Sequence, residues 1–379
     1  MDIIHQLNYF KSLADAYHFD GIGQDLKAIY RKMSDNNLYL AVIGEFNTGK
    51  STFINALLRK RLLKEAILPT TACASYISRG DGLLRVKVEF ADSSFDVNEE
   101  NMSALTCYLI RRYKHSCSNL WEVVDALTSD QTVARDVKSL SLSVPNVHFP
   151  QTVIIIDTPG FNPSDSIYSN HYGITMQVVS ERADVALILM STSHPYTNST
   201  KQFLQQYLVN YMHRCIFVLT MGDCKSPEER VEVIDYVKNK LRKDFGLQSP
   251  LVFCESAIAM LPAKNLTYQE LIEYRLWQNE FRSFEKCVWE LMRMEKKVIL
   301  AEHLRYLVLK LTKEFQKGLY MKKVKMESEL MGNSWFSKAT IDSIKNNLLS
   351  LRYVEYEVNE ELRKLKEQKY VIDYGKRAN

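Results

Sequence analysis

Short runs of consecutive apolar residues recur through the first two thirds of the chain. Predicted strands that are built mainly on such runs cover residues 38–43, 153–156, 183–190, 214–220 and 250–254. Continuous apolar runs are typical of strands that are covered on both faces, as in parallel sheets. Residues 83–90 and 139–144 alternate instead and predict half-exposed strands. Helical spacing separates most of these strands, so the order of elements predicts an α/β fold, a mostly parallel sheet flanked by helices.

Between two of these strands, residues 92–137 differ in character. They are acidic at first and then show helical spacing over residues 102–113 and 120–127. We interpret them as a helical insertion between strands of the sheet, without recognisable chemistry.

The two ends of the chain show helical periodicity without strands. Residues 2–18 place apolar side chains alternately four and three positions apart, which is the stripe of an amphipathic helix. From residue 268 Gly and Pro almost disappear, and apolar stripes run through 300–319 and 341–365 on both sides of a break at 332–334. Two antiparallel helices would leave one stripe uncovered, so we predict a bundle in which the N-terminal helix is the third partner.

A glycine-rich loop follows the first predicted strand. Residues 44–51 read GEFNTGKS, which completes G-x-x-x-x-G-K-S between a buried strand and an apolar helical pattern. Gly44 and Gly49 let the backbone turn N–H groups toward a phosphate, and the helix N-terminus adds partial positive charge. We expect Lys50 to reach the β- and γ-phosphates and Ser51 to hold Mg²⁺. The sequence therefore predicts a nucleotide site.

Further residues suit the same site. Asp157 ends the strand at 153–156, at the sheet edge where ligands of open α/β sheets bind, and is expected to hold a metal-bound water. Gly160 can offer a backbone N–H to the γ-phosphate. In the loop after Pro69, Thr71 is a candidate for closing over Mg²⁺ and the γ-phosphate; a polar loop threonine is the alternative.

Composition narrows the class of protein. The chain has 379 residues, of which 25% are charged and 46% hydrophobic, and its net charge is +4. That charge is too small to indicate a dedicated nucleic-acid binder. The seven cysteines are scattered without a C-x-x-C, which is typical of reduced thiols. With neither a signal peptide nor an eighteen-residue apolar run, we expect a cytoplasmic protein that is at most peripheral to the inner face of a membrane.

The motifs together resemble those of the bacterial dynamin-like GTPases. GEFNTGKS, Thr71 in LPTTA and DTPG at 157–160 correspond to the first three guanine-nucleotide motifs, and TMGD at 220–223 and ESA at 255–257 to the last two. The resemblance covers about residues 34–260. It implies a large GTPase that uses GTP, GDP and Mg²⁺ and whose hydrolysis is stimulated by dimerisation across the nucleotide face.

The resemblance also implies a role for each matched residue. Thr52 would contact the α-phosphate, Asp223 would accept hydrogens from the guanine edge, and the backbone at Ser256 and Ala257 would face the guanine O6. The expected nucleotide-binding residues are Gly44, Glu45, Phe46, Asn47, Thr48, Gly49, Lys50, Ser51, Thr52, Asp157, Gly160, Thr220, Asp223, Ser256 and Ala257. The expected catalytic residues are Lys50, Asn47 and Thr71, and the expected metal-binding residues are Ser51, Thr71 and Asp157.

Three positions modify this expectation. Met221 replaces the lysine that normally lies along the base, which weakens the argument for tight guanine binding. Phe161 stands where a Ras-like glutamine would orient water, as in dynamin-like enzymes. Asn47 occupies the place of the asparagine that helps bind K⁺ or Na⁺ in cation-activated GTPases; a loop-capping Asn is the alternative.

These observations predict three regions: N-terminal helices at 1–33, a GTPase domain at 34–262 and a helical neck or stalk at 263–379. The leading hypothesis is a GTP-hydrolysing protein that couples dimerisation to neck movement in membrane remodelling. Its expected partners are a second copy, a second dynamin-like protein and a membrane surface, with no nucleic acid. The alternative is a weakly hydrolysing, nucleotide-gated module that recruits a partner through its helical bundle.

Overall fold

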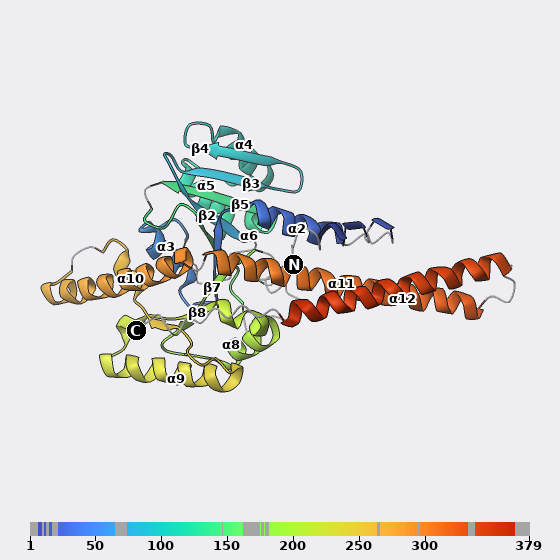
Figure 1. The fold of residues 1–379 in the computed structure, drawn as a ribbon. Helices are drawn as coiled ribbons and strands as arrows, with labels where there is room; N and C mark the ends of the chain where they lie inside the picture. The colour runs from blue at the N-terminus through green and yellow to red at the C-terminus, as the bar shows by residue number, and fades with distance from the viewer. Residues whose placement is uncertain are drawn as a thin grey trace. The chain divides into compact units, whose positions relative to one another are not determined.

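The protein was analysed as a computed structural model that divides into two compact units (Figure 1). One unit comprises Asn37–Ile299 with Ile372–Asn379, and the other comprises Met1–Asn36 with Leu300–Val371. The structure describes residues 7–9, 11–12, 15–16, 22–64, 74–145, 147–161, 175, 178, 182–263, 266–294, 296–332 and 338–367.

A nine-stranded sheet forms the centre of the first unit, in the order β4-β3-β5-β2-β6-β1-β7-β8-β9. Its strands are β1 Leu38–Gly44, β2 Ser75–Gly80, β3 Arg85–Glu89, β4 Ser94–Asn98, β5 Ser139–Pro145, β6 Val153–Asp157, β7 Val185–Ser191, β8 Cys215–Thr220 and β9 Val252–Cys254. The pairings from β6 through β1, β7 and β8 to β9 are parallel, as is β2 with β5, whereas β2–β6, β3–β4 and β3–β5 are antiparallel. This topology confirms the predicted mostly parallel sheet.

Helices connect the strands of this unit. They are α3 Lys50–Leu58, α4 Ser103–Tyr113, α5 Leu120–Ser129, α6 Gln131–Ala134, α8 Asn198–Phe203, α9 Pro227–Phe245 and α10 Tyr268–Met294, with short turns η1 Leu204–Leu208, η2 Val209–Arg214, η3 Gly222–Cys224 and η4 Ala257–Met260. Local sequence signals set both ends of α9. Ser226 and Glu229 form a capping box at its start, and Gly246 ends the helix with φ 69°.

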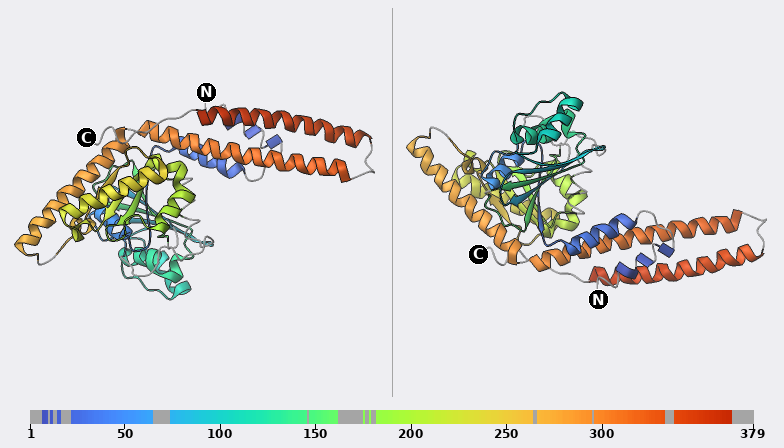
Figure 2. Two further views of the ribbon diagram at one scale, coloured as in Figure 1. Left: turned by 90° about the horizontal axis from the view of Figure 1, so that it is seen from below. Right: turned by 90° about the horizontal axis from the view of Figure 1, so that it is seen from above.

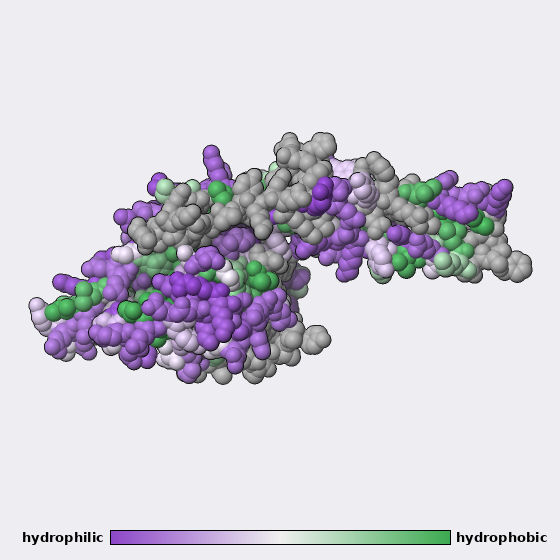
Figure 3. All heavy atoms as spheres, turned by 60° about the horizontal axis from the view of Figure 1, so that its bottom comes forward, coloured by the Kyte–Doolittle hydropathy of each residue, from purple (hydrophilic) through white to green (hydrophobic). Residues whose placement is uncertain are grey.

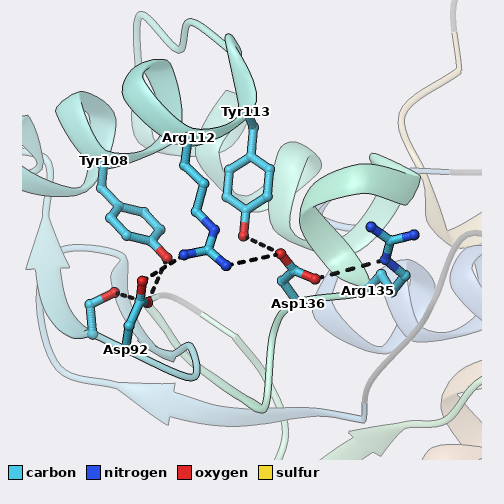
Figure 4. A network of polar contacts seen from close by, with 7 residues as sticks. Asp92, Tyr108, Arg112, Tyr113, Arg135 and Asp136 are labelled. Atoms are coloured by element: carbon cyan, nitrogen blue, oxygen red, sulfur yellow. Dashed lines mark hydrogen bonds and ion pairs between the residues drawn. The ribbon is translucent and has the colours of Figure 1, made fainter.

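The insertion between β3 and β5 contains a strand that the sequence analysis missed. β4 pairs antiparallel with β3 at the edge of the sheet. Arg112 of α4 then joins two carboxylates, with Nη1 2.6 Å from Asp92 and Nη2 3.5 Å from Asp136 (Figure 4). The Tyr108 hydroxyl donates to Asp92 and the Tyr113 hydroxyl to Asp136, both at 2.9 Å. These contacts hold α4 against the loops that flank β4 and α6.

The helix α10 groups with the sheet, although the sequence placed its residues with the neck. Phe281 and Phe284 pack on Phe53 of α3, with ring centroids 5.3 Å and 5.7 Å apart. Arg59, which caps the C-terminus of α3, forms an ion pair with Glu285 of α10. Aromatic packing and a charged pair therefore join α10 to the helix that follows the phosphate loop.

The second unit is the predicted helical bundle. It contains α2 Ile22–Ser34, α11 Lys296–Gly332 and α12 Lys338–Glu367, and α2 lies beside α11 (Figure 2). The buried core of the bundle combines residues from both ends of the sequence: Leu7, Leu26, Ile29, Leu307, Val308, Leu311, Phe315, Leu319, Val354 and Val358. Leu7 of the predicted N-terminal stripe thus packs against the C-terminal helices, whereas Ile3, Phe10, Ala14 and Tyr17 lie outside the described residues.

The surface is mostly hydrophilic on the face drawn in Figure 3, with hydrophobic residues in small groups. Across the described part of the chain, none of the helices combines the length and apolar character that a membrane span requires.

Candidate functional site

The loop after β1 has the backbone conformation of a phosphate-binding loop. Asn47 and Gly49 have positive φ of 63° and 79°, which turns the chain tightly between β1 and α3. A Cβ at Gly44 would lie 2.6 Å from Thr48 Oγ1 and 2.8 Å from the Leu189 carbonyl oxygen, so this position accepts only glycine. The loop is therefore shaped by glycine at the positions that the sequence motif requires.

The Lys50 side chain folds back onto this loop. Its Nζ donates to the carbonyl oxygens of Gly44 at 3.0 Å and Glu45 at 2.7 Å. Removal from water lowers the Lys50 pKa, and the charges of Asp157 and Glu45 oppose that shift. The ammonium group is thus positioned at the loop, where an incoming phosphate would meet it.

Asp157 and Gly160 lie next to Lys50. The parallel pairing of β1 with β6 sets Asp157 opposite Val42. Asp157 is 3% exposed, and burial raises its pKa while the positive charge of Lys50 opposes the rise. A Cβ at Gly160 would lie 2.8 Å from Lys50 Nζ. The structure therefore brings together three residues that the sequence predicted from two separate motifs.

The Glu45 carboxylate anchors the loop to α8, a contact that the sequence analysis missed. Its Oε1 accepts hydrogen bonds from the hydroxyls of Thr197, Ser199 and Thr200. Thr197 also caps α8. The run TNST marks a helix start in the sequence, but nothing there connects it to a loop about 150 residues earlier.

The remaining predicted phosphate and metal residues lie in the loop before α3, at the start of α3, or outside the described residues. Ser51 and Thr52 form the first turn of α3 and are partly exposed. Phe46 donates its N–H to the Phe161 carbonyl oxygen at 3.0 Å. Asn47 is exposed. Thr71 falls outside the described residues, so its role stays a prediction.

Phe161 belongs to the core. It is 1% exposed, and its ring stacks on Phe203 with centroids 4.2 Å apart and planes 6° apart. A side chain packed in this way cannot position a water molecule beside a phosphate. Phe161 therefore differs from a Ras-like glutamine both in its chemistry and in its packed position.

The loop after β8, residues 220–223, is tied to the phosphate loop and to the loop after β9. Thr220 Oγ1 donates to the Thr48 carbonyl oxygen at 2.8 Å, and the Gly222 N–H donates to the Glu255 carbonyl oxygen at 3.1 Å. Asp223 follows in η3 and is exposed. These hydrogen bonds gather the first, fourth and fifth predicted motifs at the carboxyl ends of β1, β8 and β9.

Beneath this loop the packing is tight. A Cβ at Gly222 would lie 2.7 Å from the Trp277 ring of α10. The guanidinium carbon of Arg230 lies over the same Trp277 ring, 4.5 Å from its centroid. Ser256 and Ala257 are buried, at 1% and 7% exposure, so their contact with guanine stays a prediction.

Glu255 is a buried carboxyl in the fifth motif. It is 4% exposed, and its Oε2 has no hydrogen-bond partner among the described residues. Burial, reinforced by the nearby carboxylates Glu280 and Glu285, raises the pKa of Glu255 to about 8. Near neutral pH this raised pKa favours the protonated side chain, which sequence reasoning could not foresee.

Comparisons with known proteins agree with this geometry. Residues 40–222 match the model of the Dynamin family. An uncharacterised protein in the xynA 3′ region of Caldicellulosiruptor sp. is 26% identical over 262 residues, 68% of this chain and 59% of that protein. The probable transmembrane GTPase FZO-like, chloroplastic, of Arabidopsis thaliana is 27% identical over 231 residues, 61% of this chain and 20% of that protein.

Dynamin-like protein A of Bacillus subtilis is 22% identical over 281 residues, 62% of this chain and 23% of that protein. A solved oligomerised bacterial dynamin pair aligns with a TM-score of 0.49 and 19% identity over 96% of this chain and 64% of that chain. The chain thus spans between 20% and 59% of the length of these three curated relatives. Residues 40–222 match the Dynamin family, and the chain is similar in sequence to bacterial dynamin-like proteins.

Proposed function

We propose that this chain binds and hydrolyses GTP at the loop 44–51 and the carboxyl ends of β6 and β8. The observation that carries the proposal is the placement of Lys50, whose ammonium group lies on the loop carbonyls beside Asp157 and Gly160. A charge held in place before the substrate arrives stabilises developing phosphate charge without reorganisation during the reaction. The match of residues 40–222 to the Dynamin family supports the same reaction.

The donor set fits Mg²⁺. Ser51 supplies a hydroxyl at the start of α3 and Asp157 a buried carboxyl, and hard cations of this kind prefer oxygen ligands. We propose that Ser51, Asp157 and Thr71 hold Mg²⁺, which would neutralise charge on the β- and γ-phosphates. In this arrangement Lys50 and the backbone N–H groups of the loop orient the phosphates, and Asp223 selects guanine.

We also propose that a monovalent cation and a second protein surface assist hydrolysis. Phe161 is packed in the core, so the described residues place no glutamine-like group beside the γ-phosphate. The exposed Asn47 remains beside the site and would help hold K⁺ or Na⁺ there. Closing the site then requires a second surface, which we propose is the nucleotide face of a second copy or of another dynamin-like protein.

At the level of the whole protein, we propose that dimerisation and hydrolysis move the helical bundle and remodel a membrane to which the protein binds peripherally, at the inner face. The alternative is a nucleotide-gated module that recruits a partner through its bundle. Met221 favours this alternative because it removes the charge that normally lies along the base. A nucleic-acid partner is not expected, since the net charge is only +4.

GTP turnover tests the site directly. Lys50→Ala is expected to lower turnover at least about 100-fold, because it removes the charge that faces the phosphates. Lys64→Ala is the matched control; this lysine pairs with Asp125, and its side chain is 62% exposed. Turnover in K⁺ or Na⁺ should exceed turnover in Cs⁺. Equal rates in all three salts would remove the role of Asn47, and an unaffected Lys50→Ala would overturn the site.

A further inference from the structure

Glu45 places a carboxylate in the loop that is proposed to bind phosphates. Like charges repel each other, so an acidic side chain beside a phosphate site needs compensation within the protein. Lys50 and the backbone N–H groups of the loop are sufficient to orient the phosphates, and the Glu45 carboxylate has no part in that chemistry. Its contacts must therefore serve another purpose.

Hydroxyl groups at the start of α8 contact one oxygen of this carboxylate. Glu45 Oε1 accepts hydrogen bonds from Thr197, Ser199 and Thr200, the last at 2.9 Å. We call these three residues the hydroxyl clamp. Hydrogen bonds to an ionised acceptor are about twice as strong as those between neutral groups. The hydroxyl clamp therefore compensates the charge of Glu45 and fixes the position of its side chain.

The main chain of Glu45 supports Lys50 at the same time. The Glu45 carbonyl oxygen accepts from Lys50 Nζ at 2.7 Å and from Thr48 Oγ1 at 2.7 Å. The Thr48 N–H donates to the same oxygen at 3.3 Å. Because the hydroxyl clamp fixes the side chain of Glu45, it restricts rotation of the main chain that carries this oxygen. The position of the Lys50 ammonium group therefore depends on α8.

The start of α8 is in turn fixed to α9. The Tyr196 hydroxyl donates to the Asp244 carboxylate at 2.8 Å, and Lys201 Nζ forms an ion pair with the same carboxylate at 3.0 Å. Asp244 lies in the last turn of α9, the helix that follows the loop with Asp223. The helix α8 thus connects the phosphate end of the proposed site to the helix that follows its base end.

We propose that Glu45 is a positioning residue of the phosphate site, held by the hydroxyl clamp so that its carbonyl oxygen supports Lys50. The inference rests on the proposed nucleotide site and adds the start of α8 to it. The Glu45 side chain acts through Lys50 and not on the phosphates. Without the hydroxyl clamp the loop is free to leave the conformation in which Lys50 meets the phosphates, so nucleotide affinity falls.

Binding of GDP to the full chain, measured by calorimetry, tests the proposal. Glu45→Ala removes the acceptor and should weaken binding at least about tenfold, because hydrogen bonds to a charged group are lost. Glu45→Gln keeps an oxygen acceptor and should recover most of that loss, binding GDP about threefold more weakly than the wild type. Ser283→Ala is the control and should bind as the wild type does; it removes an exposed hydroxyl of α10 that donates to the Asn279 carbonyl oxygen.

Ser199→Ala completes a double-mutant cycle. Alone it should weaken GDP binding at least about threefold, and in the Glu45→Ala background it should have no further effect. It removes one donor and leaves the carboxylate in place, so it tests the hydroxyl clamp even if Glu45→Ala does not fold. Unchanged binding by Ser199→Ala, or losses that add independently, would refute the positioning role and leave the nucleotide site standing. If the wild type binds no GDP, the proposed function fails and the positioning role with it.

Discussion

At the scale of single residues, two carboxyls of the candidate site have raised pKa values. Asp157 and Glu255 are both buried, and burial raises the pKa of each carboxyl. They differ in their surroundings. Lys50 opposes the shift of Asp157, whereas the carboxylates Glu280 and Glu285 increase that of Glu255. Asp157 is therefore suited to gain charge when a cation arrives, and Glu255 remains protonated.

Glu255 leads to a pH prediction for stability. Its pKa is about 8 in the folded protein against the usual value of 4.5. Between these values the folded state holds a proton that the unfolded chain has released, so the free energy of unfolding falls as pH rises. The contribution of Glu255 should fall by about 3 kcal/mol from pH 6 to pH 9. Glu255→Gln keeps the shape of the protonated side chain and should remove this part of the pH dependence.

Urea unfolding of the wild type and of Glu255→Gln at pH 6 and pH 9 measures the effect. The compared quantity is the change in the free energy of unfolding between pH 6 and pH 9. Other titrating groups are common to both proteins, so their contributions cancel when the two changes are subtracted. Equal changes in the free energy of unfolding for the two proteins would show that the Glu255 carboxyl is not held in its protonated form.

At the scale of elements, the phosphate loop is positioned by helices on both sides. The Glu45 carboxylate fastens the loop to the N-terminus of α8. The helix α3 begins at Lys50, and Arg59 at its other end pairs with Glu285 of α10. The Arg59 and Glu285 side chains are only 20% and 10% exposed, so this pair is shielded from solvent screening.

Removing one partner of a shielded pair leaves the other charge without compensation. Glu285→Ala is therefore expected to lower the free energy of unfolding by about 3–5 kcal/mol. The matched control is Asp96→Ala, which breaks the exposed pair with Arg85, where the side chains are 62% and 44% exposed. That change should cost less than about 1 kcal/mol. Chemical denaturation of both variants compares them, and equal losses would contradict the structural role of the Arg59–Glu285 pair.

The elements also show what a single sequence can predict. Long apolar runs identified β1, β6, β7 and β8, because strands covered on both faces need apolar residues at every position. β4 escaped prediction because SFDVN places only Phe95 and Val97 among polar residues at a sheet edge. Motif spacing located Lys50, Asp157 and Gly160. The contacts of Glu45 with Thr197 and of Gly222 with Trp277 join segments that are distant in the sequence. No local sequence pattern indicates such contacts.

At the scale of the whole molecule, the chain pairs a nucleotide-binding sheet with a bundle made from both of its ends. The bundle core joins Leu7 and Ile29 to Phe315 and Val358, so it needs the N-terminal helices as well as α11 and α12. The match of residues 40–222 to the Dynamin family supports the GTPase function proposed for this sheet. We propose that GTP hydrolysis requires two such chains meeting at their nucleotide faces.

The specific rate of GTP hydrolysis, measured against protein concentration with Mg²⁺ and K⁺ present, tests this claim most directly. If each copy completes the site of the other, the GTP hydrolysis rate per molecule should rise with protein concentration. It should level off when all of the protein is dimeric. Lys50→Ala should stay at background across the same range. A rate per molecule that is constant from low to high concentration would contradict dimer-dependent catalysis, and no turnover at any concentration would contradict the GTPase itself.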